Sequence, residues 1–263
     1  MAVQLEHRDD GVAVLTLDDP DRRNAMTDAM GDALSQRCEE LADDEDVRVV
    51  VLTGTPPAFS GGGDLAMLED LAQRTREAGF DATDTMQAFY RRFLAVRDVP
   101  VPVIAAINGH AVGAGLCVAL ACDLRIVALD AKVGLNFAKL GLHPGMGGTW
   151  FLPRLLGAQQ AAAWLYTGEL IDGATAAAQG LALEAAPPDE VVPKALDLAA
   201  RIASSAPGTV RQLKQTLAAV EHQDLDAALA TEAAAQAVSY GSDDLIEGLT
   251  AARERRPPRF EGR

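Results

Sequence analysis

Cysteine is scarce in this chain, and the few cysteines present do not fit a disulfide framework. There are three in 263 residues, Cys38, Cys117 and Cys122, an odd number without any CxxC pair. Small secreted domains that depend on disulfides are much richer in paired cysteines. We therefore expect reduced thiols and a cytoplasmic protein.

Positive charge is also in deficit. The chain carries 23 Lys and Arg against 38 Asp and Glu, which gives a formal net charge of −15. A field of this sign repels the phosphates of nucleic acids and anionic membrane surfaces. We expect no nucleic-acid partner, and an anionic small ligand would need cations placed locally.

Long apolar runs and a basic leader are missing as well. The longest apolar stretches, such as residues 99–107, contain proline and are too short to span a bilayer. The first residues, MAVQLEHRDDG, lack the basic region and apolar run of a secretory signal. The sequence therefore predicts no membrane insertion.

Histidine is rare, and common cofactor motifs are absent. His7, His110, His143 and His222 show no metal-ligand spacing such as HExxH. The glycine-rich segments match neither GxxxxGK[ST] nor GxGxxG, and no GxSxG elbow surrounds Ser60. We expect no metal site and no resident cofactor.

The hydrophobic pattern predicts two parts, an α/β part over residues 1–190 and an alanine-rich helical part over residues 191–263. From about Gly147 onward the pattern is almost wholly helical. Strands are predicted at 3–7, 12–17, 47–53, 101–107 and 123–129, and helices at 28–42, 65–77, 83–99 and 113–121. Thr27 is the expected N-cap of the first helix.

Two glycine-rich turns each join a predicted strand to a predicted helix. They are SGGG at 60–63 and NGHAVGAG at 108–115. Helix starts present unpaired N–H groups, and glycine lets a ligand approach the backbone closely. Two such loops without an attached cation fit a carbonyl group that becomes an oxyanion during reaction. The alternative is that the glycines only permit tight packing of strand on helix.

Six stretches, in order along the chain, resemble the enoyl-CoA hydratase/isomerase (crotonase) superfamily. They are DDPDRRNAMT (18–27), AFSGGGDL (58–65), PVIAAINGHAVGAGLCVALACDLRI (102–126), LGLHPGMGGTWFLPRLLG (140–157), TGELIDGATAAAQGLALE (167–184) and EGLTAARERRPPRF (247–260). The resemblance implies an α/β, crotonase-like spiral of ββα turns with a helical C-terminal trimerisation module. It also implies an acyl-CoA thioester ligand and assembly as a homotrimer or a dimer of trimers.

The resemblance also implies roles for individual residues. The oxyanion donors would be the backbone N–H groups of Gly63 and Ala114. The acyl-CoA would be bound near the first loop and the segment before it, with Phe260 able to stack on the adenine. The binding residues expected on this basis are Arg23, Ala25, Gly62, Asp64, Leu65 and Phe260.

The sequence departs from the family at both acid–base positions. Relatives use two glutamates around a water, and these positions hold Cys117, three residues after Ala114, and Phe137, seven residues before Pro144. Neither side chain performs carboxylate chemistry at neutral pH. The substitutes considered are a Cys117 thiolate and the side chains of His110, Asn136 and His143, each of which also has an ordinary packing or hydrogen-bonding role.

Two functional hypotheses follow from this departure. The first is an enzyme that transforms acyl-CoA thioesters in lipid metabolism with a two-amide oxyanion hole but without glutamate chemistry, so that ordinary hydration is very slow. The second is a non-catalytic acyl-CoA binder or carrier, which an aromatic residue at position 137 favours. A protein-interaction role is a weaker third hypothesis.

Overall fold

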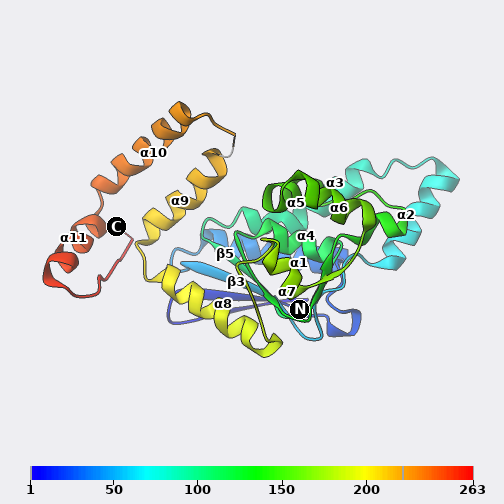
Figure 1. The fold of residues 1–263 in the computed structure, drawn as a ribbon, viewed down its shortest axis with the longest axis horizontal. Coiled ribbons are helices and arrows are strands. Elements are labelled where there is room, and N and C mark those ends of the chain that lie inside the picture. The colour runs from blue at the N-terminus through cyan, green and yellow to red at the C-terminus, as the bar shows by residue number, and fades with distance from the viewer. Residues whose placement is uncertain (1, 221, 263) are drawn as a thin grey trace.

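A six-stranded sheet forms the centre of the protein, which a computed structural model describes over residues 2–220 and 222–262 (Figure 1). Its strand order is β1-β2-β3-β5-β7-β10, antiparallel between β1 and β2 and parallel elsewhere. The bounds are β1 (Val3–His7), β2 (Val12–Leu17), β3 (Val49–Gly54), β5 (Val103–Ile107), β7 (Leu124–Ala128) and β10 (Glu184–Ala186).

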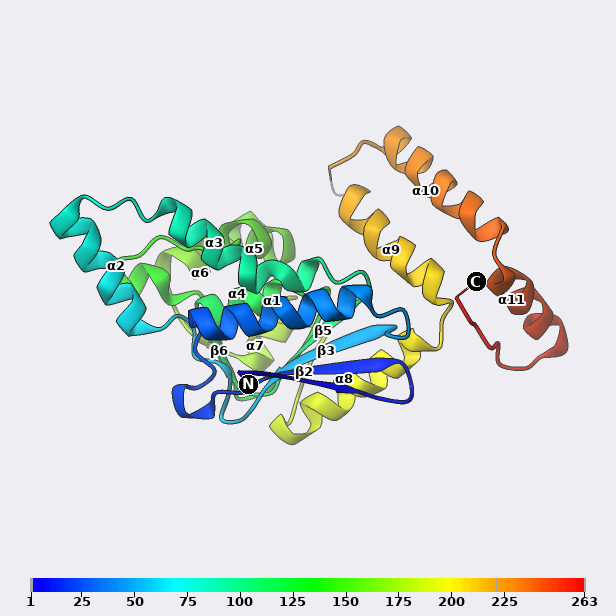
Figure 2. The ribbon, with the colours of Figure 1, turned by 180° about the vertical axis from the view of Figure 1, so that it is seen from behind.

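The central strands are buried because helices cover both faces of the sheet. Every residue of β3 and β5 is buried, as expected for parallel strands rich in valine and isoleucine. Figure 2 shows α1 (Asp28–Asp43) and α8 (Pro188–Ala203) on opposite sides of the strands. Thr27 caps α1 as predicted, since its hydroxyl accepts from the Met30 N–H at 3.2 Å.

A second, smaller sheet was not predicted from the sequence. Its order is β4-β6-β8-β9, and its strands are two or three residues long. The bounds are β4 (Ala58–Ser60), β6 (His110–Val112), β8 (Lys132–Gly134) and β9 (Ile171–Asp172). The prediction of an almost wholly helical chain after Gly147 was therefore wrong at β9 and β10.

The remaining helices of the body surround these sheets. They are η1 (Pro20–Arg22), α2 (Leu65–Ala78), α3 (Thr83–Leu94), η2 (Ala95–Arg97), α4 (Ala114–Ala121), η3 (Asn136–Leu140), α5 (Gly148–Leu156), α6 (Ala158–Thr167) and α7 (Gly173–Ala178). All eight residues of α4 are buried, so this helix lies inside the body. No helix among the described residues has the length and apolar character needed to cross a membrane.

The last three helices project from the body. Figures 1 and 2 show α9 (Pro207–Val220), α10 (Leu225–Tyr240) and α11 (Asp243–Glu254) at the end of the molecule opposite α2. The predicted boundary at residue 190 falls within α8, which packs on β3, β5 and β7. Lys214 of α9 holds the projecting part to the body through the Val101 carbonyl and the Asp123 carboxylate, both at 2.9 Å.

Candidate functional site

The first glycine loop is held by hydrogen bonds on both sides. The Ser60 hydroxyl, at the end of β4, donates to the Asn24 carbonyl at 2.7 Å and accepts from the Gly62 N–H at 3.2 Å. After the loop, the Asp64 carboxylate caps α2 by accepting from the Met67 N–H at 2.9 Å. The loop is therefore fixed at its start by Ser60 and at its end by a helix cap.

The second glycine loop enters α4 through a conformation that favours glycine. Gly113 has φ 53°, and its N–H donates to the Gly134 carbonyl of β8 at 2.9 Å. No side chain caps α4. The first turn of this buried helix thus presents backbone N–H groups without the usual capping oxygen.

The two loops touch one another at Gly62. Gly62 has φ +100°, and a Cβ placed on it would lie 2.6 Å from the Val112 carbonyl oxygen and 3.8 Å from the Ala114 nitrogen. A Cβ on Gly115 would likewise collide with Ser60. These two glycines permit close packing of loop on loop. Gly63 differs, because the nearest atom to its added Cβ is 3.8 Å away, on Leu68.

The two amides expected to bind the carbonyl oxygen are free. Neither the Gly63 N–H nor the Ala114 N–H donates a hydrogen bond to any residue that the structure describes. Their neighbours Gly62 and Gly113 both have acceptors. Because buried backbone N–H groups are nearly always paired, an unpaired Ala114 N–H in a buried position indicates a ligand-binding donor.

The position where the resemblance leads us to expect the first glutamate holds a neutral thiol. Cys117 is fully buried, and its sulfur lies 3.5 Å from the Gly145 carbonyl oxygen. Burial raises the pKa of this thiol to about 12, although a hydrogen bond from the Gly148 backbone partly opposes the shift. A Cys117 thiolate is therefore not available as a base or nucleophile at neutral pH.

The position where the resemblance leads us to expect the second glutamate holds an aromatic ring beside the second glycine loop. The Phe137 ring would come within 3.8 Å of a Cβ placed on Gly113, and the Asn136 side-chain oxygen within 3.1 Å. Both residues open the short helix η3 and are half-buried. Asn136 thus lies beside the residue that precedes Ala114, close enough to contact a bound carbonyl group.

The two histidines considered as substitutes are both exposed and hydrogen-bonded to the backbone. His110, in β6, accepts from the Lys132 N–H through Nδ1 at 3.0 Å. His143 has Nδ1 2.8 Å from the Pro144 carbonyl oxygen. These contacts favour the packing roles over acid–base roles for both residues.

The segment before α1 joins the first glycine loop directly. The Gly61 N–H donates to the Arg23 carbonyl at 2.8 Å, and the Met26 N–H donates to the Gly62 carbonyl at 2.8 Å. Arg23 is exposed, while Ala25 is buried. Leu65, on the other side of the loop, is 65% exposed. Arg23 forms no ion pair with any residue that the structure describes, and its side chain begins beside Gly61 of this loop.

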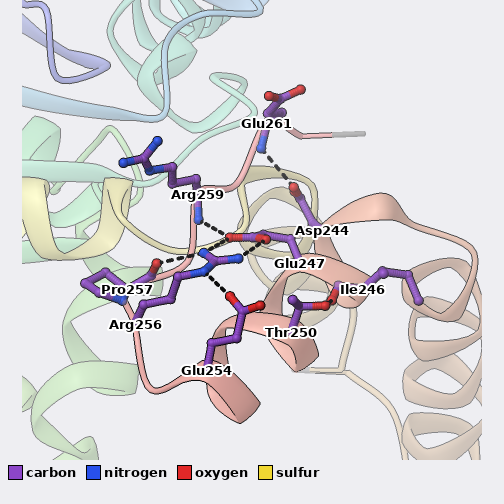
Figure 3. Close-up of polar contacts among 9 residues, drawn as sticks. All are labelled: Asp244, Ile246, Glu247, Thr250, Glu254, Arg256, Pro257, Arg259 and Glu261. Carbon is purple, nitrogen blue, oxygen red and sulfur yellow. Dashed lines mark hydrogen bonds and ion pairs between the residues drawn. The ribbon is translucent and has the colours of Figure 1, made fainter.

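The expected adenine partner Phe260 lies elsewhere in this chain. Its carbonyl accepts from Arg48 at 2.8 Å, and its ring packs near Gly248 of α11. Figure 3 shows that Arg256 is paired with Glu247 and Glu254 rather than free. The C-terminal tail that carries Phe260 thus folds back on α11, at the end of the molecule opposite α2 (Figure 1).

Sequence reasoning missed Tyr90, whose hydroxyl reaches the site from α3. A Cβ on Gly145 would collide with the Tyr90 hydroxyl oxygen. The Cys117 sulfur lies 3.5 Å from the carbonyl oxygen of the same Gly145, so both side chains lie against this residue. No sequence signal pointed to Tyr90, because α3 precedes α4 in the chain and the contact depends on how the two helices pack.

Other features of the surface do not form a competing site. A hollow of about 640 Å³ is lined by residues 7–12, 44 and 46–48, at the ends of β2 and β3 that lie away from the glycine loops. It contains four aspartates beside His7, Arg8 and Arg48. Within the described residues, no group of three His, Cys, Asp or Glu is arranged to hold a metal ion.

Comparison with known proteins identifies the family of the chain. The family model described as enoyl-CoA hydratase/isomerase matches residues 7–263. A probable enoyl-CoA hydratase of Mycobacterium tuberculosis is 40% identical over 253 residues, which cover 94% of this chain and 96% of the relative. The mitochondrial methylglutaconyl-CoA hydratase of Mus musculus is 33% identical over 262 residues, covering 98% and 82% respectively.

Solved structures show the same fold over the full length. A putative enoyl-CoA hydratase/isomerase from Mycobacterium abscessus has a TM-score of 0.92 at 33% identity, with 100% of both chains covered. An enoyl-CoA hydratase from Bacillus anthracis has a TM-score of 0.91 at 32% identity, again with 100% of both chains covered. The predicted crotonase-like α/β fold is confirmed, and the chain belongs to the enoyl-CoA hydratase/isomerase family.

Proposed function

We propose that the protein binds an acyl-CoA thioester with its carbonyl oxygen between the N–H groups of Gly63 and Ala114. The observation that carries this proposal is that both amides lack an acceptor where the two glycine loops meet. Two backbone donors at one oxygen stabilise an oxyanion or enolate, and losing one such donor costs about 3 kcal/mol of barrier in known enzymes. Family membership supports an acyl-CoA transformation as the activity.

The reaction would not follow the two-glutamate hydration route. Hydration needs one group to remove a proton from water and another to donate one to carbon. Cys117 and Phe137 supply neither, since one is a neutral buried thiol and the other an aromatic ring. Losing acid–base groups costs about 10²–10⁴-fold per role, so hydration of crotonyl-CoA should be close to background.

The alternative function is a non-catalytic acyl-CoA binder or carrier. The observation that favours it is the apolar character of the two positions beside Ala114, where Cys117 and Phe137 replace charged groups. Such a pocket holds an acyl chain without offering acid or base. Turnover, rather than binding, therefore separates the two functions.

The remaining expectations concern setting and assembly. We expect a role in fatty-acid metabolism in the cytoplasm, with no cofactor beyond the CoA carried by the substrate and with no nucleic-acid partner. We expect α9, α10 and α11 to act as the trimerisation module of a homotrimer or a dimer of trimers. The apolar residues that these helices expose support this role, among them Leu217 at 68% and Leu225 at 72%.

The oxyanion donor can be removed with little change to the helix. Ala114 is the first residue of α4, a position where proline suits the helix geometry, and proline there replaces the N–H by a ring carbon. Ala158 has the equivalent place at the start of α6 and serves as the matched control. Calorimetry with butyryl-CoA should show roughly micromolar binding by the unmodified protein, no change for Ala158→Pro, and about tenfold weaker binding for Ala114→Pro.

Two results would contradict the proposal. One is the absence of binding by the unmodified protein across several acyl chain lengths. The other is equal binding by the Ala114→Pro and Ala158→Pro variants when both show native circular dichroism. A panel of acyl-CoA thioesters analysed by mass spectrometry then distinguishes enzyme from binder. Crotonyl-CoA hydration at the rate typical of efficient enzymes, with kcat/KM about 10⁴–10⁸ M⁻¹s⁻¹, would show that the glutamates are not needed.

A further inference from the structure

Tyr90 brings a phenol hydroxyl to the backbone beside Cys117. The residue is half-buried in α3, which contacts α4, and its ring meets the Phe89 ring edge to face at a centroid distance of 6.4 Å. Its hydroxyl lies so close to Gly145 that any side chain at position 145 would displace it. The contact fixes where this hydroxyl can lie.

The Cys117 thiol lies against the same glycine, Gly145. Cys117 Sγ lies 3.5 Å from the Gly145 carbonyl oxygen and near Gly148. Burial raises the pKa of Tyr90, and Cys117 raises it further. Tyr90, Gly145 and Cys117 therefore form one cluster, in which the phenol stays protonated at neutral pH and acts as a hydrogen-bond donor.

This cluster lies about one helical turn from the oxyanion donor. Ala114 and Cys117 are three residues apart on α4, which corresponds to about 4.5 Å along the axis on the same face. That length is about three carbon–carbon bonds. When a thioester oxygen is bound at Ala114, an acyl chain that runs along this face brings its second and third carbons to the level of Tyr90.

The Tyr90 hydroxyl also lacks a partner. It makes no hydrogen bond within residues 2–220 and 222–262. The Cys117 sulfur, which also lies against Gly145, is directed at the Gly145 carbonyl oxygen at 3.5 Å. Asn136 lies at Gly113, nearer the carbonyl end. Tyr90 is thus the O–H donor placed at the level of the first acyl carbons.

We propose that Tyr90 recognises the acyl group by donating its phenol hydrogen to an oxygen carried on the third carbon of the acyl chain. This inference rests on the proposed binding of the thioester at Gly63 and Ala114. It makes Tyr90 a specificity-determining residue of this chain, in a site where the two family glutamates are replaced. An acyl chain without that oxygen leaves the half-buried hydroxyl unpaired, which weakens its binding.

The test compares two ligands of equal chain length, acetoacetyl-CoA and butyryl-CoA, which differ by an oxygen acceptor on the third carbon. Binding of both to the unmodified protein and to Tyr90→Phe and Tyr166→Phe is measured by calorimetry at pH 7. Tyr166 is 83% exposed on α6 and controls for loss of a phenol oxygen. We expect the unmodified protein and Tyr166→Phe to prefer acetoacetyl-CoA by about tenfold.

Tyr90→Phe should lose this preference while its affinity for butyryl-CoA stays within twofold. A role in packing alone would change both affinities together and leave their ratio intact. The inference is overturned if the unmodified protein shows no preference, or if Tyr90→Phe keeps it. Failure of both ligands to bind the unmodified protein would instead reject the thioester site itself, and with it this role of Tyr90.

Discussion

Single side chains decide which chemistry is available beside Ala114. Cys117 follows it by one helical turn and is fully buried, with a pKa raised to about 12 by burial. Burial also raises the thiol pKa values of Cys38 and Cys122 to about 12. At pH 8, a thiol with that pKa is ionised to a fraction on the order of 10⁻⁴. None of the three cysteines is therefore a ready nucleophile.

The first prediction concerns alkylation of these thiols. Iodoacetamide at pH 8 should leave all three cysteines of the native protein unmodified, because they are both buried and protonated. In urea, which unfolds the protein, all three cysteines should be alkylated within the labelling time used for the native protein. Peptide mass spectrometry locates the label. Rapid labelling of native Cys117 that acyl-CoA blocks would show that this residue is a reactive thiolate facing the ligand.

How far single residues could be foreseen depended on how local their environment is. The Thr27 cap was predicted and is confirmed, since a capping residue precedes its own helix. Whether the Gly63 and Ala114 N–H groups have hydrogen-bond acceptors depends on how the two loops pack together. A local sequence pattern does not reveal such packing. Tyr90 was missed for the same reason, because its contact with Gly145 joins distant segments.

Among the elements, the C-terminal tail is held to α11 by a compact set of charges (Figure 3). Glu247 accepts from Arg256 at 2.6 and 2.8 Å and from the Arg259 N–H at 2.8 Å. Asp244 accepts from the N–H groups of Glu261 and Gly262 at 2.8 and 3.0 Å. Residues 256–262 are thereby fixed in the folded-back course that takes Phe260 to Arg48.

The second prediction is a pH dependence of this attachment. Hydrogen bonds from Arg256, followed by that of Arg259, lower the pKa of Glu247 from 4.5 to about 2. Its contribution to stability is therefore fully present above about pH 4.5 and is lost as the pH falls toward 2. The urea midpoint of Glu247→Gln should lie below that of the unmodified protein at pH 7, and this difference should shrink at pH 3.

Glu232, an exposed glutamate on α10, provides the matched control. Its glutamine variant should have the same midpoint as the unmodified protein at both pH values, because an exposed side chain without an ion pair among the described residues contributes little to stability. If the urea midpoints of Glu247→Gln and the unmodified protein differed equally at pH 7 and pH 3, the negative charge of Glu247 would not be what holds the tail to α11.

Element prediction succeeded where periodicity was strong and failed where strands were very short. The hairpin of β1 and β2 and the buried β3, β5 and β7 have runs of valine, leucine and isoleucine that predict strands. Strands of the second sheet have two or three residues and lie within glycine-rich turns. Such segments are too short to show the alternation of apolar and polar residues that predicts a strand. They are recognised as strands only from their hydrogen bonds to neighbouring strands.

For the whole molecule, the apolar surface of α9, α10 and α11 is the feature that needs a partner. The exposed apolar residues on these helices are Leu213, Leu217, Leu225, Leu229, Val238, Tyr240, Ile246 and Leu249. The chain carries a net charge of −15, so copies repel one another at long range unless an apolar contact offsets this. Large exposed apolar patches on soluble proteins typically mark interaction surfaces, and assembly of this chain with itself stays a prediction.

The third prediction tests that surface with one charge. Leu217→Asp on α9 should reduce the mass of the particle from that of a trimer or hexamer to that of a single chain at micromolar concentration. A carboxylate buried in an apolar interface loses its hydration without gaining a partner, which disfavours association. Leu183, exposed to 64% on the body of the protein, gives the control substitution Leu183→Asp. Size-exclusion chromatography with light scattering measures the masses. A monomeric unmodified protein, or a Leu217→Asp variant with unchanged mass, would mean that these helices do not form the oligomer.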